Sequence, residues 1–122
     1  MRILWFTNTP SCYAVDSKGY NGGGWISSLE EEIKKESHIE LGICFQTSDK
    51  IGKTKKKNVT YYPIRQPFGL IKKTFTAFHT IDNLYLKEYL KVIEDYKPDI
   101  INIFGTENNF GLISLHTKVP AL

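Results

Sequence analysis

Short apolar runs alternate along this chain with segments of helical periodicity, and this alternation constrains the fold more than any other feature. The runs lie at residues 3–6, 39–45, 59–64 and 99–104. The first is a continuous Ile-Leu-Trp-Phe sequence bounded by Thr7-Asn8-Thr9-Pro10, which is typical of a strand buried on both faces of a parallel sheet. We therefore predict four strands, and the stretch between the second and the third has no room for a helix of normal length.

Helical spacing marks the segments between and after these runs. Trp25, Leu29 and Ile33 recur every four residues, and the glutamates at 30–32 precede the lysines at 34–35, the order that a helix dipole favours. Helical spacing also covers residues 68–78 and 81–96, and the second pattern ends where Pro98 stops a helix. A short helix is predicted over 110–117. Strands that alternate with helices predict an α/β fold, a Rossmann-like parallel sheet with helices on both faces.

Composition limits the class of protein. The chain has 122 residues, enough for one domain, and its content of 41% hydrophobic and 24% charged residues is ordinary for a soluble globular fold. The net charge of +3 is too mild to demand a nucleic acid partner. The sequence shows no signal peptide and no membrane span, so we expect a cytoplasmic protein. Cys12 and Cys44 have no metal-ligand spacing and are expected to be reduced and structural.

The last residues read as the start of another strand. An α/β pattern places the next strand at Lys118-Val119-Pro120-Ala121-Leu122, where the sequence stops. A free end on a half-started central strand leaves sheet hydrogen bonds unmade. We therefore expect residues 1–122 to be one Rossmann-like domain that is truncated at its C-terminus.

A glycine triplet precedes the first predicted helix. Gly22, Gly23 and Gly24 offer bare backbone N–H groups and the positive end of a helix dipole, which suit a phosphate or another anion. The alternative is that the glycines only permit a tight turn into the helix. The spacing matches neither the dinucleotide fingerprint nor the P-loop.

The connection that leads from the first strand to these glycines is unusually long. Strand-to-helix connections in this class run about two to six residues, and longer ones tend to be functional. It follows a strand at its carboxyl end, where open α/β sheets bind ligands. Its hydrogen-bonding and stacking side chains suit a polyhydroxylated ligand; they are Asn8, Ser11, Tyr13, Asp16, Lys18, Tyr20 and Asn21.

A second polar segment follows the strand that ends at Phe104. Glu107 and Asn108 are expected at the same sheet edge as the glycines, so that two polar loops face one crevice. Glu107 can orient a sugar hydroxyl or act as an acid or base, and it can equally cap the short helix that follows. Asn108 is also a candidate helix cap.

Histidines and lysines suggest no further chemistry. His38, His79 and His116 lack partners at metal-ligand spacing, and we expect no bound metal. The lysines at positions 53 and 55–57 are most simply a solvated turn. Their functional alternative is an electrostatic contact with an anionic surface, which predicts salt-sensitive binding.

Taken together, three segments resemble the N-terminal half of a GT-B glycosyltransferase of the family-four, glycogen-synthase-like group. They are residues 1–8, 22–29 and 97–105, and in order and spacing the resemblance covers essentially the whole chain. It departs from the family at Asn102-Ile103-Phe104, where many relatives read His-x-His.

The resemblance implies two Rossmann-like domains that face each other across a cleft. The C-terminal domain holds most of the nucleotide-sugar donor, and the domain seen here mainly shapes the acceptor site. Gly22, Gly23 and Gly24 then lie near the donor diphosphate and the acceptor, with Asn8, Glu107 and Asn108 as further substrate-binding residues. The resemblance assigns no catalytic residue to this half and implies neither metal nor cofactor.

The expected function is therefore that of the acceptor-side domain of an enzyme that transfers a sugar from a nucleotide diphosphate sugar to a glycan or glycolipid, in cell-surface polysaccharide synthesis. Its expected partners are the donor, the acceptor and the missing C-terminal domain, with peripheral contact at the inner membrane surface as an option. On its own this domain is expected to be inactive. The alternative is a non-catalytic flavodoxin-like ligand-binding or regulatory module that is complete at this length.

Overall fold

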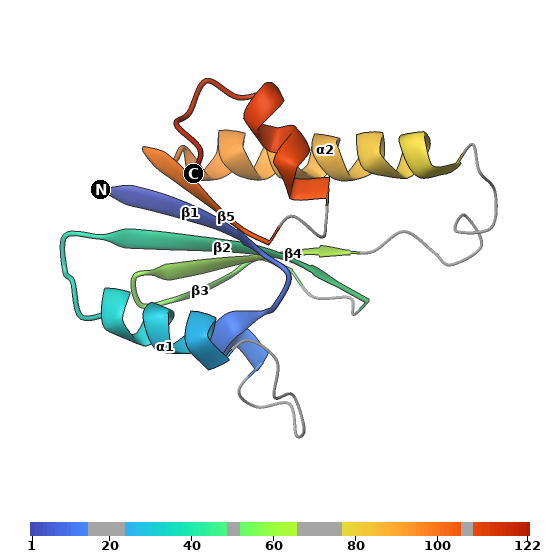
Figure 1. Ribbon diagram of the computed structural model, residues 1–122. Coiled ribbons are helices and arrows are strands. Elements are labelled where there is room, and N and C mark those ends of the chain that lie inside the picture. Colours follow the sequence, from blue (N-terminus) through green and yellow to red (C-terminus); the bar gives the residue numbers. More distant parts are fainter. Residues whose placement is uncertain (15–23, 49–51, 66–76, 106–108) are drawn as a thin grey trace.

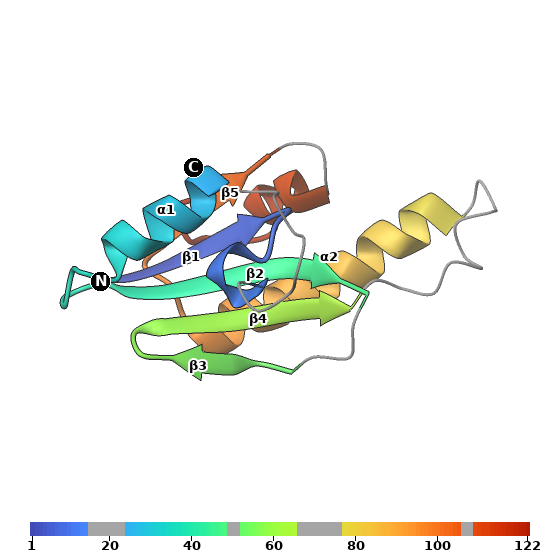
Figure 2. The same ribbon diagram turned by 90° about the horizontal axis from the view of Figure 1, so that it is seen from below.

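The computed structural model describes residues 1–14, 24–48, 52–65, 77–105 and 109–122, and it is built around one five-stranded sheet (Figure 1). The sheet order is β3-β4-β2-β1-β5, with β3 at one edge and β5 at the other (Figure 2). Four strands are parallel, and β3 is antiparallel to β4. The strands are β1 (Arg2–Thr7), β2 (Glu40–Thr47), β3 (Thr54–Lys56), β4 (Val59–Arg65) and β5 (Ile100–Phe104).

Helices cover both faces of this sheet. The helix α1 (Gly24–Ile33) lies on one face, and α2 (Ala77–Tyr96) lies on the other together with the 3-10 helix η3 (Asn109–Leu115) (Figure 1). A second 3-10 helix, η1 (Ser11–Ala14), follows β1. The predicted α/β fold with helices on both faces is confirmed. The predicted helix over 110–117 is a 3-10 helix instead, and the helical pattern over 68–78 lies mostly outside the described residues.

The prediction of a purely parallel sheet is wrong at the lysine-rich segment. Thr54–Lys56 forms β3, and only the two residues that follow form a tight turn before β4. Lys57 has a φ of 56° in that turn, a position that favours glycine in two-residue hairpins. A short edge strand that carries lysines resists pairing with the edge of another sheet, so the lysines serve the fold here.

The order of the parallel strands is that of a Rossmann-like sheet. The third parallel strand, β4, pairs with β2, whereas a flavodoxin-like order would place it beside β1. The chain then crosses to the other side of β1 through α2, and β5 pairs with β1. Beyond β5, Ala121 forms an isolated parallel bridge with Ile101, and the Leu122 N–H donates to the Ile101 carbonyl at 2.9 Å.

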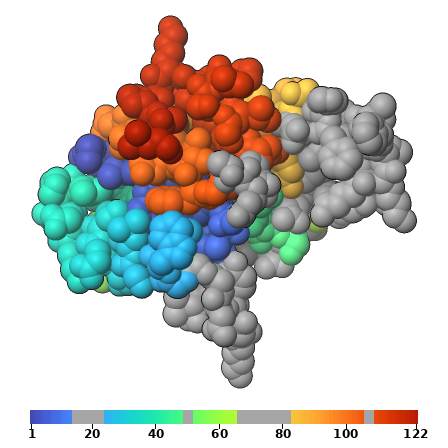
Figure 3. Space-filling model, in the orientation of Figure 1, coloured from blue at the N-terminus to red at the C-terminus, as the bar shows by residue number. Residues whose placement is uncertain are grey.

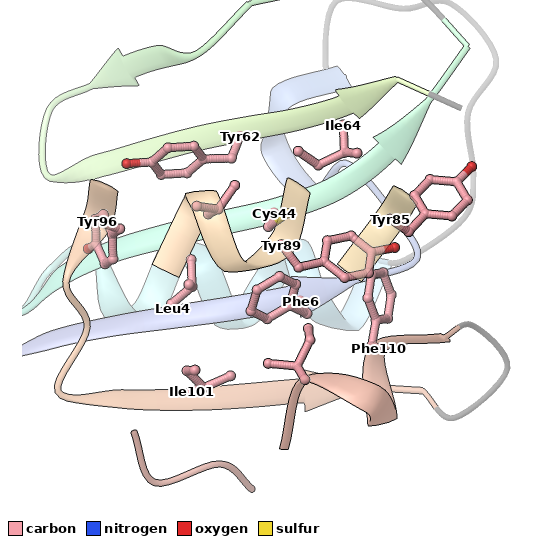
Figure 4. Packing of buried hydrophobic residues seen from close by; sticks show 12 residues of the cluster. Leu4, Phe6, Cys44, Tyr62, Ile64, Tyr85, Tyr89, Tyr96, Ile101 and Phe110 are labelled. Atoms are coloured by element: carbon pink, nitrogen blue, oxygen red, sulfur yellow. The ribbon is translucent and has the colours of Figure 1, made fainter. Parts of the chain in front are cut away.

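Two hydrophobic clusters, one on each face, hold these layers together. Alternation along β1 sends Leu4 and Phe6 toward α2 and Trp5 toward α1, which confirms a strand buried on both faces. The cluster on the α2 face is rich in aromatic rings (Figure 4). Those rings are Phe6, Tyr62, Tyr85, Tyr89, Tyr96 and Phe110.

The C-terminal half of α2 lies close to the sheet. At Gly42 in β2, an added Cβ would lie 2.9 Å from the Leu4 Cδ1 and 3.0 Å from two ring atoms of Tyr96, so the close approach requires glycine. The helix ends as the sequence predicts. Lys97 adopts a φ of 53°, its N–H donates to the Ile93 carbonyl at 2.8 Å, and Pro98 follows.

The buried face of α1 differs from the one that its apolar spacing indicates. Ile26 and Glu30 are 2% and 0% exposed, whereas Trp25 is 62% exposed and Leu29 is 37% exposed. The helix itself is therefore predicted correctly and its orientation is not. A buried glutamate of the helix, with partners on η1, on β4 and at Lys34 just after α1, determines which side faces the sheet.

Candidate functional site

The carboxyl ends of β1 and β5 define the candidate site. The chain leaves β1 toward β2 on one side and reaches β5 on the other, so the sheet order reverses between these two strands. Open α/β sheets bind ligands at such a switch point. The N-terminal end of α1 lies on this same side of the sheet, where β1 ends (Figure 1).

Two of the predicted substrate-binding residues belong to the described structure, and both lie at this edge. Asn8 directly follows β1 and is exposed. Gly24 is the first residue of α1, and among the described residues no atom lies within 4 Å of a Cβ added there. Among the described residues, the Cβ position at Gly24 is therefore unobstructed. The other predicted site residues, Gly22, Gly23, Glu107 and Asn108, lie outside the described residues, as do Asp16, Lys18, Tyr20 and Asn21.

The segment after β1 turns toward the protein interior. This contradicts the expectation that Ser11 and Tyr13 face a ligand. Ser11 is 6% exposed, and its hydroxyl donates to the Glu30 carboxylate at 2.5 Å. Tyr13 packs at a ring-centroid distance of 5.3 Å from both Phe45 and Tyr61, and the Lys56 ammonium lies over its ring. The Ser11 side chain is therefore part of the protein interior, and the half-buried Tyr13 packs against the core through Phe45 and Tyr61.

Glu30 is the anchor of this inward turn. Its carboxylate accepts hydrogen bonds from the Ser11 hydroxyl and, at 3.0 Å, from the Cys12 N–H, and it also accepts one from the Tyr61 hydroxyl. Ser11 and Cys12 donate to Oε2, and the Lys34 ammonium lies 2.7 Å from Oε1, the oxygen that also accepts from Tyr61. Burial alone raises the pKa of Glu30, yet the hydrogen bonds from Lys34, Ser11 and Tyr61 outweigh it and lower the pKa. Glu30 is therefore a carboxylate that fixes the path of the chain as it leaves β1.

A buried hydroxyl lies next to this path. The Thr7 hydroxyl donates to the Thr9 carbonyl at 2.5 Å, which closes a tight bend after β1. Thr9 is 9% exposed, and its own hydroxyl makes no hydrogen bond among the described residues. This bend separates the exposed Asn8 from the buried Ser11.

Two consecutive hydrogen bonds connect polar side chains at the same edge of the sheet, on the α2 face. The Gln46 amide donates to the Tyr89 hydroxyl at 2.6 Å, and that hydroxyl donates to the Asn109 side-chain oxygen at 2.9 Å. The three residues come from the end of β2, from α2 and from the start of η3. Figure 4 shows the rings of Tyr85 and Tyr89 side by side, and they stack with centroids 5.9 Å apart. The two hydrogen bonds connect the elements that surround the carboxyl edge.

Trp25 is the aromatic residue at the surface of this edge. Its ring contacts Phe104 at the end of β5, with centroids 5.4 Å apart, and Phe104 in turn contacts the buried Trp5 at 5.1 Å. Gly105 follows with a φ of 93°, which favours glycine and turns the chain away from β5. Sequence periodicity assigned Trp25 to the packed face, so it was missed as a surface residue. The position of Trp25 directly after the three glycines was the sequence feature that could have indicated an exposed residue at the site.

The lysine-rich segment is partly engaged in the fold. Lys53 pairs with Asp95 at 2.6 Å, and Lys56 lies over the rings of Tyr13 and Tyr61. Lys55 and Lys57 are exposed. Two exposed lysines on a hairpin would bind an anionic surface more weakly than the four lysines expected from the sequence.

Neither cysteine is placed to act as a nucleophile. Both are free; Cys44 is fully buried and Cys12 is partly buried. Burial and the neighbouring Glu31 raise the pKa of the Cys12 thiol to about 12, so it stays protonated at neutral pH. Within the described ranges, no group of three His, Cys, Asp or Glu residues could hold a metal ion.

Comparison with known proteins adds no assignment to this geometry. No protein-family model matches the chain, and no curated protein matches it. Among the helices in the described part of the chain, none is long and apolar enough to cross a bilayer.

Proposed function

We propose that this chain is the acceptor-side domain of a GT-B glycosyltransferase, which transfers a sugar from a nucleotide diphosphate sugar to a glycan or glycolipid in cell-surface polysaccharide synthesis. One observation carries the proposal. The parallel strands follow the order β4-β2-β1-β5, and the N-terminus of α1 lies at the switch point between β1 and β5. This arrangement supports a ligand site at the edge where the sequence resemblance expects one.

The chemistry of the edge suits a sugar substrate and a diphosphate leaving group. The first N–H groups of an α-helix have no partner within the helix, and no described atom lies within 4 Å of a Cβ added at Gly24, so this helix start suits an anion. Stabilisation of developing negative charge is a large catalytic term. The exposed Asn8 amide can both donate to and accept from sugar hydroxyls. In this proposal the donor is held by a second domain, and the described residues need neither metal nor cofactor.

A matched pair of glycine variants tests the proposal. At both Gly24 and Gly111 an added Cβ meets no described atom within 4 Å, but only Gly24 lies at the α1 N-terminus. The full-length protein is assayed for hydrolysis of, and transfer from, a panel of nucleotide sugars. We expect Gly24→Leu to reduce transfer at least tenfold and Gly111→Leu to leave it within about twofold, with equal thermal stability.

Two results would count against the proposal. The first is a full-length protein that neither hydrolyses nor transfers any donor in a broad panel, which favours a non-catalytic binding module. The second is an equal loss of transfer in both glycine variants, since that would separate the activity from the α1 N-terminus.

A further inference from the structure

An exposed tryptophan is held in a fixed place at the candidate site. Trp25 is 62% exposed, whereas Trp5, the other tryptophan of the sequence, is 2% exposed. Phe104 links the two, with interplanar angles of 81° to Trp5 and 73° to Trp25. In the space-filling view α1, in blue and cyan, and β5, in orange, lie side by side at the surface (Figure 3). Three aromatic rings in contact, Trp5, Phe104 and Trp25, therefore extend from the core to the surface at the carboxyl edge.

The surroundings of Trp25 restrict its motion. The next residue, Ile26, is buried in the cluster beneath α1, and Phe104 supports the indole from β5. A side chain that is already ordered loses little conformational entropy when a ligand contacts it. The contact with Phe104 is expected to reduce this entropic cost for Trp25.

The size of the apolar surface favours a small ring over a protein partner. A tryptophan side chain that is fully buried contributes about 250 Å², so 62% exposure leaves about 150 Å² of indole at the surface. Leu29, one turn later, adds little at 37% exposure. A stable protein interface needs about 800 Å² on each partner. One sugar ring covers an indole face.

Three polar residues belong to the elements that meet at this edge. Asn8 is exposed after β1, Ser28 is exposed on α1, and Asn102 is half-buried on β5 in register with Trp5. A pyranose has one face of C–H groups with partial positive charge, which the negative face of an aromatic ring attracts, while its hydroxyl groups need amide or water partners. An exposed indole at an edge of the sheet that also carries amide side chains matches that combination.

From these observations we infer that Trp25 is a substrate-binding residue that stacks against a pyranose ring of the saccharide acceptor. The inference rests on the proposed function and specifies its acceptor subsite. In this inference the indole face of Trp25 binds a sugar ring of the acceptor at the carboxyl edge, and this contact contributes to the specificity for the acceptor.

The two indole N–H signals in a ¹H–¹⁵N spectrum of the full chain provide the test. Trp25→Phe identifies the Trp25 signal by its loss. Maltohexaose, cellohexaose and chitohexaose are titrated as saccharide probes, with uridine and guanosine diphosphates for comparison. We expect at least one hexasaccharide to shift the Trp25 signal and leave the Trp5 signal in place.

Variants on α1 quantify the contact. Loss of about 60 Å² of apolar contact corresponds to about tenfold weaker binding, which we expect for Trp25→Ala. Trp25→Phe retains an aromatic face and is expected to lose about threefold. Leu29→Ala, on the same helix, is the matched control and should change the dissociation constant less than twofold. In the full-length enzyme Trp25→Ala should raise KM for the acceptor and change kcat little.

The outcomes separate this inference from the proposed function. Sugar transfer by the full-length protein, without any shift of the Trp25 signal, overturns the stacking and keeps the function. A shift caused by the nucleotides alone, or a change of oligomeric state in Trp25→Ala measured by light scattering, also overturns the stacking. Absence of both transfer and saccharide binding overturns both.

Discussion

Replacing Glu30 by glutamine should destabilise the protein more than any conservative change on the outer face of α1. The carboxylate is fully buried, accepts hydrogen bonds from Ser11, Cys12 and Tyr61, and pairs with Lys34 at 2.7 Å. A glutamine removes the charge and presents an amide N–H₂ to groups that are themselves donors. Breaking a buried pair costs about 3–5 kcal/mol.

The structure reduces this figure because one partner can reach water. Lys34 is 21% exposed at its side chain, and glutamine keeps one oxygen as an acceptor. We therefore expect a loss of about 2–3 kcal/mol, or about 10 °C in the melting temperature of a domain of this size. Glu31→Gln is the matched control. Glu31 also pairs with Lys34, at 2.9 Å, but it is 61% exposed and the pair is screened by water, so Glu31→Gln should leave the melting temperature almost unchanged.

The pH dependence gives a second, independent check. The pKa of Glu30 in the folded protein is lowered from its ordinary value of 4.5, so the unfolded chain binds the proton more tightly. The stabilisation by the carboxylate is therefore fully present above about pH 4.5 and is lost as the pH falls through the folded pKa. Thermal melts of wild type, Glu30→Gln and Glu31→Gln, followed by circular dichroism between pH 7 and pH 3, measure both effects. Equal melting temperatures for the two variants, or a wild-type advantage over Glu30→Gln that does not shrink below pH 4.5, would refute the reasoning.

Three further substitutions test the packing and the backbone, each by urea unfolding. Gly42→Ala places a methyl group against the Tyr96 ring, 3.0 Å away, and should cost about 1–3 kcal/mol; no loss would mean that α2 can move off the sheet. Lys97→Gly relieves a φ of 53° at the end of α2 and should stabilise by about 0.5–1 kcal/mol, unless the helix ends differently in solution. Tyr89→Phe removes the hydroxyl that joins Gln46 and Asn109 and should cost about 1–2 kcal/mol; Tyr85→Phe, in the stacked neighbour, should cost less than half as much.

The strands were predictable because burial on both faces leaves a direct mark in the sequence. Residues 3–6 are a continuous apolar run, residues 100–104 are apolar except for Asn102, and the two segments pair in parallel as β1 and β5. An extended segment at 118–122 was expected from the same alternation, and within it Ala121 forms an isolated bridge with Ile101. The edge strand β3 was not predictable in this way. It has almost no apolar pattern, and its pairing with β4 depends on a turn at Lys57 that carries no glycine signal.

The candidate site was predictable in location and less so in composition. A long connection after β1 and a helix that begins with glycine placed it at the carboxyl edge, and Asn8 and Gly24 lie there. Residue type alone could not separate Ser11 from Asn8, because both are small polar residues in the same connection. The difference arises from Glu30, 19 residues after Ser11, whose carboxylate draws one hydroxyl inward.

The orientation of α1 links these observations. Apolar spacing favoured a helix that buries Trp25 and Leu29, and the structure instead buries Glu30 with Ile26. Burial of a carboxylate is unfavourable unless hydrogen bonds and a counter-charge compensate it. Here two groups from η1, one from β4 and the Lys34 ammonium just after α1 do so. The same rotation of the helix that buries Glu30 turns the Trp25 indole outward beside Phe104. The burial of Glu30 and the exposure of the Trp25 indole at the carboxyl edge thus both follow from the way α1 is rotated against the sheet. Disruption of the Glu30 contacts should therefore also loosen the packing of Trp25 against Phe104.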